Sequence, residues 1–202
     1  MNKIESWSDV TVRQLIEIKK LDLDNTANTI GTQNKLVEIL FGVKADDMQF
    51  DEYMEKVLAV SEVLSKPLVG VYKPKFEFGG CEFEAVPIET FTTREFTDFD
   101  TLARENNAEN FPLLLALIYR GSGDDEYDKD DYSDCVKDKA ELLKNIDVVT
   151  AVGAINFFTN ALLRYLKDTI ASSDAAKVMM EKNPKMKESM KMLEDYLAGV
   201  GN

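Results

Sequence analysis

The chain has 202 residues, of which 45% are hydrophobic and 30% charged, the balance of a folded protein with a sizeable core rather than of a disordered one. Its formal net charge of −13 opposes nonspecific binding to nucleic acid and to anionic membranes, because such binding depends on lysine and arginine contacts with phosphate. It contains no histidine, which excludes Ser–His and Cys–His nucleophile pairs and removes the commonest metal ligand.

The amino-terminal unit, residues 1–66, is predicted to be helical. Ser8, Asp9 or Thr11 can cap the first helix, and Thr11 with Gln14 has the spacing of a capping box. Gly42 is a suitable residue to end the second helix, and Pro67 cannot continue the third. The expected helices run from the cap to Leu21, over 33–41 and over 51–64.

A change of period predicts a β-hairpin within 67–90. Apolar and charged residues alternate over 72–78 and again over 81–85, and Gly79-Gly80 joins the two runs. An isolated two-stranded hairpin is marginal in water, so this one must pack on the helices or pair with another chain. The large apolar side chains of the first run are therefore candidate contacts with a neighbouring chain: Tyr72, Phe76 and Phe78.

The remaining residues, 91–202, are predicted to form a helical bundle. Thr92 and Glu95 make a second capping box, and Asn110 with Pro112 starts a short apolar helix. The expected helices run over 92–105, 110–118, 132–144, 146–171 and 174–198, the last with an interruption at Pro184. The chain is thus expected to be mainly α (α+β), a helical bundle with one small antiparallel β-hairpin, in one or two compact domains.

The uncharged stretch 148–163 has to be considered as a membrane span. It is shorter than the ~20 residues that a bilayer needs. It also contains Asn156 and Asn160 and is flanked by Asp147 and Arg164. A buried central helix is the better interpretation. Since no secretory signal is visible at the amino terminus, we expect synthesis in a cytoplasm and no membrane partner.

Acidic residues gather in the loop 124–131. An EF-hand loop starting at Asp124 would need glycine where Lys129 stands and glutamate where Cys135 stands, so the calcium motif fails. A solvated loop is the favoured interpretation, ahead of a docking site for a basic surface and of a weak cation site. The candidate docking residues are Asp124, Asp125, Glu126, Asp128, Asp130 and Asp131.

Patterns for other chemistries lead to no catalytic, metal or cofactor site. With 37 acidic residues, carboxylate pairs arise by chance, so a carboxylate-dependent enzyme is a less favoured alternative. Gly79-Gly80 and Gly121-Ser122-Gly123 lack the features of phosphate loops and are interpreted as turns. Cys81 and Cys135 form no CxxC pair, and two free buried thiols are favoured over a disulfide.

The carboxy-terminal tail carries an apolar stripe at helical spacing, made of Met186, Met190, Leu193 and Leu197. Such a stripe is more often ordinary core, and its functional interpretation is a helix that docks into a groove on a neighbouring subunit. Lysines make this tail less acidic than the rest of the chain: Lys177, Lys182, Lys185, Lys187 and Lys191. Contact between the tail of one copy and the acidic loop of another is electrostatically reasonable.

Three segments resemble small virion and assembly proteins of tailed bacteriophages, notably the crAss-like phages. They are 7–11 (WSDVT) with Gln14 and Leu15, 115–120 (LALIYR) before the acidic loop, and Phe157-Phe158. The resemblance implies a helical protein of the head-to-tail region, such as a neck or tail ring subunit, a packaged cargo protein or a tail assembly chaperone. It brings no catalytic residues with it.

The expected function is therefore that of a structural virion component, made in the cytoplasm of the bacterial host and acting through protein–protein contacts. Its expected partners are other virion or assembly proteins and further copies of the chain, present as a homo-oligomer or in multiple copies, and neither nucleic acid nor a membrane. A transient tail or capsid assembly chaperone is the alternative from a different class.

Overall fold

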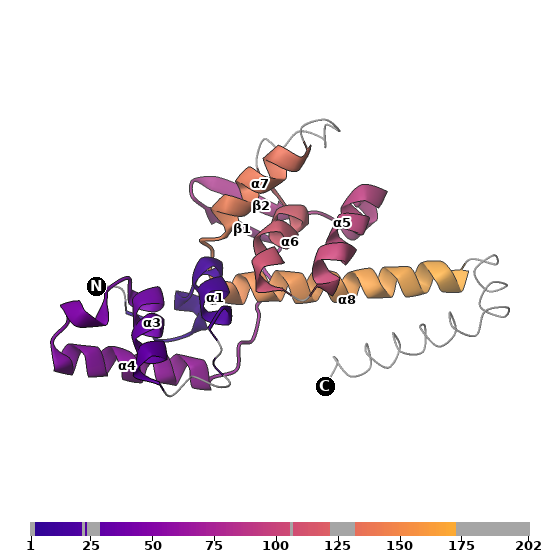
Figure 1. The fold of residues 1–202 in the computed structure, drawn as a ribbon. Helices are drawn as coiled ribbons and strands as arrows, with labels where there is room; N and C mark the ends of the chain where they lie inside the picture. The colour runs from indigo at the N-terminus through magenta and orange to yellow at the C-terminus, as the bar shows by residue number, and fades with distance from the viewer. Residues whose placement is uncertain (1–2, 22, 24–28, 106, 122–131, 173–202) are drawn as a thin grey trace.

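The computed structural model describes residues 3–21, 23, 29–105, 107–121 and 132–172, and it confirms a mainly α (α+β) fold (Figure 1). The helices are α1 (Val12–Lys19), α3 (Ile30–Phe41), α4 (Phe50–Ser65), α5 (Thr93–Arg104), α6 (Phe111–Ile118), α7 (Tyr132–Leu143) and α8 (Val148–Ser172). The strands are β1 (Lys75–Phe78), β2 (Cys81–Ala85) and β3 (Tyr119–Gly121), which form one antiparallel sheet in the order β1-β2-β3.

Both predicted capping boxes are confirmed at the start of α1 and α5. The backbone N–H of Gln14 donates to Thr11 Oγ1 over 3.2 Å, and the N–H of Thr11 donates to Gln14 Oε1 over 2.9 Å. Thr92 and Glu95 repeat this exchange at α5 over 3.2 and 2.7 Å. Each exchange satisfies two of the backbone donors that a helix start leaves without partners.

The second and third helices are also found, with different bounds. The helix predicted over 33–41 begins three residues earlier, because the Thr29 hydroxyl accepts from the N–H of Thr32 over 3.2 Å and caps α3 at Thr29. It ends as expected at Gly42, whose φ of 69° lies in the left-handed region that favours glycine.

The hairpin is confirmed, but the sheet is larger than the sequence indicated. Gly79 and Gly80 have φ values of 60° and 78°, the two positive angles that a tight hairpin turn requires. The first strand starts at Lys75 rather than Tyr72, and β3 pairs with β2 at the end of α6. Sequence periodicity missed this third strand because three residues are too few to show alternation.

The described residues contain two hydrophobic clusters. The central cluster lies around α6 and consists of Val12, Ile16, Phe83, Phe99, Leu114, Leu115, Ala116, Leu117, Ile118, Tyr119, Val136, Ala140, Leu143, Ile146, Ala151, Ala154, Phe158 and Leu162. The amino-terminal cluster consists of Ile4, Val10, Leu15, Ile18, Leu36, Val37, Leu40, Val60, Val63 and Val148. Helices α1 and α8 contribute to both clusters and so join them.

Helix α8 contains the stretch predicted to be a buried central helix. Its buried side chains include Val148, Thr150, Ala151, Ala154, Phe158 and Leu162. Figure 1 shows the carboxyl-terminal half of α8 extending away from α3 and α4. Among the residues that the structure describes, no helix is long and apolar enough to cross a membrane.

The segment that leaves α4 crosses α8 at very short range. A Cβ atom built on Gly70 would lie 2.2 Å from the backbone nitrogen of Gly153, and one built on Gly153 would lie 2.2 Å from the carbonyl carbon of Val71. The N–H of Val71 donates to the carbonyl of Val149 over 2.9 Å. Gly70, Gly153 and this hydrogen bond thus hold the segment between α4 and β1 against α8.

Candidate interaction surface

Helix α4 exposes apolar side chains that its own core does not use. Val60 and Val63 are buried in the amino-terminal cluster. Phe50, Met54 and Leu58 are exposed to 73%, 38% and 66% of their full area. Residues four apart lie on one face of a helix. These three side chains therefore form an exposed apolar row along α4, which we call the α4 stripe.

A groove between α3 and α4 continues the uncharged surface beside the stripe. Its volume is about 300 Å³, and it is lined by Leu23, Gln33, Leu36, Val57, Val60, Ser61, Leu64 and Ser65. With 3.6 residues per turn, Val57 and Leu64 lie between buried Val60 and the stripe. Groove and stripe therefore form one continuous uncharged face.

The other side of the stripe is acidic. Asp51, Glu55 and Glu62 follow one another along α4 and are exposed, and we call them the acidic edge. Lys66 Nζ donates to Glu62 over 2.7 Å, and this hydrogen bond lowers the pKa of the Glu62 carboxyl below its usual value. An apolar row beside carboxylates suits a partner whose own apolar row is flanked by basic residues.

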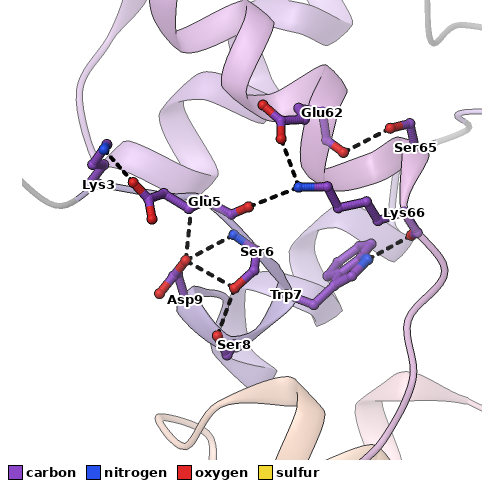
Figure 2. Close-up of polar contacts among 9 residues, drawn as sticks. All are labelled: Lys3, Glu5, Ser6, Trp7, Ser8, Asp9, Glu62, Ser65 and Lys66. Atoms are coloured by element: carbon purple, nitrogen blue, oxygen red, sulfur yellow. Dashed lines mark hydrogen bonds and ion pairs between the residues drawn. The ribbon is translucent and has the colours of Figure 1, made fainter.

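The carboxyl end of α4 is held by the amino-terminal segment, as Figure 2 shows. The indole N–H of Trp7 donates to the carbonyl of Lys66 over 2.9 Å, and Trp7 also packs on the amino-terminal cluster. Lys66 Nζ donates to the carbonyl of Glu5 over 3.3 Å. The stripe is thus presented by a helix that is anchored at its end, and a rigid apolar surface loses less entropy on binding than a mobile one.

The sequence shows the spacing of the α4 stripe but does not show that the stripe is exposed. Phe50, Met54 and Leu58 are spaced at i, i+4 and i+8, and all the charged residues of α4 lie on the remaining side of the helix. The sequence predicts this helix over 51–64, which leaves out Phe50, and its pattern does not indicate which face is buried. Only the structure shows that the core covers Val60 and Val63 and leaves the stripe exposed.

The predicted hairpin contacts turn towards the chain's own core. Tyr72 stacks on Phe157 with ring centroids 3.8 Å apart, and Phe76 lies edge-on to Tyr119 at 4.9 Å. Tyr72, Phe76 and Phe78 are partly buried against the central cluster. Strand β1 is an outer strand of the sheet, and its pairing with a neighbouring chain stays a prediction.

Two other predicted surfaces lie outside the described residues. They are the acidic loop 124–131 and the tail stripe Met186, Met190, Leu193 and Leu197. The side chain of Cys135 lies outside them as well. Cys81 is free, as expected, but it is exposed on β2, so the expectation of a buried thiol there was wrong.

A pocket of about 600 Å³ adjoins β3 and the start of α5. Its charged lining includes Arg120 and the buried Glu95, which form an ion pair. Glu95 also caps α5, so this pair links α5 to the sheet rather than presenting a reactive group. Within the described residues, no group of three or more Cys, Asp or Glu side chains is placed to hold a metal ion.

Comparison with known proteins gives no relative from which a site could be transferred. The chain matches no protein-family model, no curated protein and no solved structure.

Proposed function

We propose that the chain is a structural component of a tailed-phage virion and that it acts through protein–protein contacts. The observation that carries the proposal is the α4 stripe, because apolar side chains gathered on one helix face beside a groove are typical of a protein interface. The phage context is supported by the resemblance of the segments that begin at Trp7, Leu115 and Phe157.

The size of the exposed area supports a binding role for the stripe. Full burial of a phenylalanine, leucine or methionine side chain contributes about 1.5–3 kcal/mol. Phe50 and Leu58 are each exposed to about two thirds or more of their full area. A partner that covers them therefore gains most of this burial free energy at each position. The pocket beside β3 offers less to a charged ligand, because Glu95 and Arg120 are already paired.

The test uses Leu58→Asp in the phage genome that encodes the chain, with Val69→Asp as the matched control. Val69 is 67% exposed but lies outside α4. We expect Leu58→Asp to lower the titre of infectious particles at least tenfold while the purified variant keeps its circular dichroism spectrum. The control should change neither.

Mass spectrometry of purified wild-type particles completes the test. A structural component is present in them at a fixed copy number. A chain that is needed for assembly but missing from mature particles would contradict the proposal and favour the assembly chaperone. Normal titres for Leu58→Asp would show that the α4 stripe has no binding role in assembly.

A further inference from the structure

We propose that the α4 stripe binds the carboxy-terminal segment 185–198 of a neighbouring copy, docked as an antiparallel helix. The inference rests on the proposed function, because it names the partner of the same surface. Segment 185–198 lies outside the described residues, and its pattern is taken from the sequence alone.

The acidic edge disfavours pairing of the stripe with the α4 of a second copy. When two identical helices pack antiparallel, the same edge of each faces the other. Asp51 and Glu55 of one copy would then lie beside the same residues of its partner, and like charges at this range destabilise a helix pair. The partner of the stripe should therefore carry basic residues along its edge.

Segment 185–198 has this pattern in the same register. On α4, Asp51 follows Phe50 and Glu55 follows Met54. In the tail, Lys187 follows Met186 and Lys191 follows Met190, so a tail bound as a helix would carry its lysines on the same edge of its apolar row. An antiparallel pair places these edges together.

The paired edges are complementary in charge. With Met190 opposite Met54, Lys191 lies between Asp51 and Glu55 along the axis, and Lys187 lies closest to Glu55. The tail edge also carries Glu194, so it presents two lysines and one glutamate. Met186, Met190, Leu193 and Leu197 would cover Leu58, Met54 and Phe50.

The course of α8 favours a neighbouring copy over the chain's own tail. Val148, at the start of α8, is part of the amino-terminal cluster. The helix then continues to Ser172 and carries the chain away from α4 (Figure 1). At about 1.5 Å per residue it covers roughly 37 Å. To bind its own α4, the tail must run back along the length of α8. Two copies can exchange tails without such a reversal.

The first experiment measures the oligomeric state of the full chain by sedimentation equilibrium. We expect a wild-type oligomer whose dissociation constant rises at least tenfold in Leu58→Asp and in Met190→Asp. Val69→Asp should leave it unchanged. Glu55→Lys should also weaken the oligomer, and adding Lys191→Glu to it should restore most of the affinity. Circular dichroism checks that each variant is folded.

The second experiment locates the contact with cysteines in a Cys81→Ser, Cys135→Ser background. Met54→Cys and Met190→Cys chains are purified separately, mixed and oxidised. A disulfide-linked dimer that contains one chain of each kind supports the proposal. A Val69→Cys chain mixed with Met190→Cys should give none. A doubly substituted chain that forms the disulfide only within itself would overturn the assignment to a neighbouring copy.

The outcomes separate this inference from the proposed function. A wild-type chain that is monomeric at all concentrations overturns the tail exchange. If the wild-type chain is monomeric but Leu58→Asp still lowers the titre of infectious particles, the stripe binds another virion protein and the proposed function stands. If Leu58→Asp changes neither the oligomer nor the titre, the tail exchange fails and the α4 stripe has no binding role in assembly.

Discussion

At the scale of single residues, the crossing of Gly70 and Gly153 has no room for a methyl group. We predict that Gly153→Ala lowers the free energy of unfolding by about 1–3 kcal/mol, because the added Cβ meets the backbone at Val71. This outweighs the gain of up to ~1 kcal/mol that alanine brings to a helix. Urea unfolding measures the change.

Gly31→Ala is the matched control for this prediction. Gly31 is also helical, in α3, and a Cβ there would meet no atom within 4 Å among those the structure describes. This variant should gain about 1 kcal/mol from helix propensity. Equal responses of the two variants would contradict the importance of the crossing.

Tyr119 links the stability of the fold to alkaline pH. Its ring is buried and its hydroxyl donates to the carbonyl of Lys73 over 2.7 Å. Burial, with a smaller contribution from nearby Tyr72, raises the pKa of Tyr119 well above its ordinary value near 10.0. The contribution of protonated Tyr119 to the free energy of unfolding is complete below pH ~10. It is lost as the pH rises above this value, because Tyr119 of the unfolded chain releases its hydroxyl proton at a lower pH than Tyr119 of the folded chain.

Tyr119→Phe tests this linkage. The variant should lose about 1 kcal/mol at pH 7, since the hydrogen bond to Lys73 is removed. Its stability should then fall less steeply than that of the wild type between pH 9 and pH 12. Denaturant unfolding at a series of pH values gives the free energy of unfolding of both proteins as a function of pH. Parallel pH dependences would show that the ionisation of Tyr119 is not linked to unfolding.

At the scale of elements, α5 depends on a contact that joins its first turn to β3. Glu95 caps the helix and pairs with Arg120. We predict that Glu95→Gln keeps the cap, because an amide oxygen can accept from Thr92, but lowers the free energy of unfolding by about 2 kcal/mol. The partial exposure of Arg120 keeps the loss below that of a fully buried pair. Glu38→Gln, at an exposed site on α3, should change it by less than about 0.5 kcal/mol.

The elements that the sequence predicted correctly are those whose signals are local. Thr11 and Thr92 each cap a helix within three residues, and Gly79-Gly80 fixes its hairpin turn by itself. Strand β3 and the pairing of Arg120 with Glu95 were missed because both depend on residues far apart in the sequence. The α4 stripe was missed for a related reason, since which face of a helix is covered depends on the packing of other elements.

At the scale of the whole molecule, α1 and α8 make one cooperative unit of the two hydrophobic clusters. Helix α1 places Val12 in the central cluster and Leu15 in the amino-terminal cluster. Helix α8 does the same with Ala151 and Val148. Neither cluster can lose its packing without exposing apolar side chains of helices that the other cluster also needs.

Leu40→Ala and Leu117→Ala test this coupling, one from each cluster. Both leucines are buried, one in each cluster. Each variant should lose about 2–5 kcal/mol. Trp7, the single tryptophan, packs on the amino-terminal cluster and reports on it by fluorescence, while circular dichroism reports on all helices. In Leu117→Ala the two signals should shift together, as in a two-state transition. Fluorescence that keeps the wild-type midpoint while the helices unfold earlier would show that the clusters unfold separately.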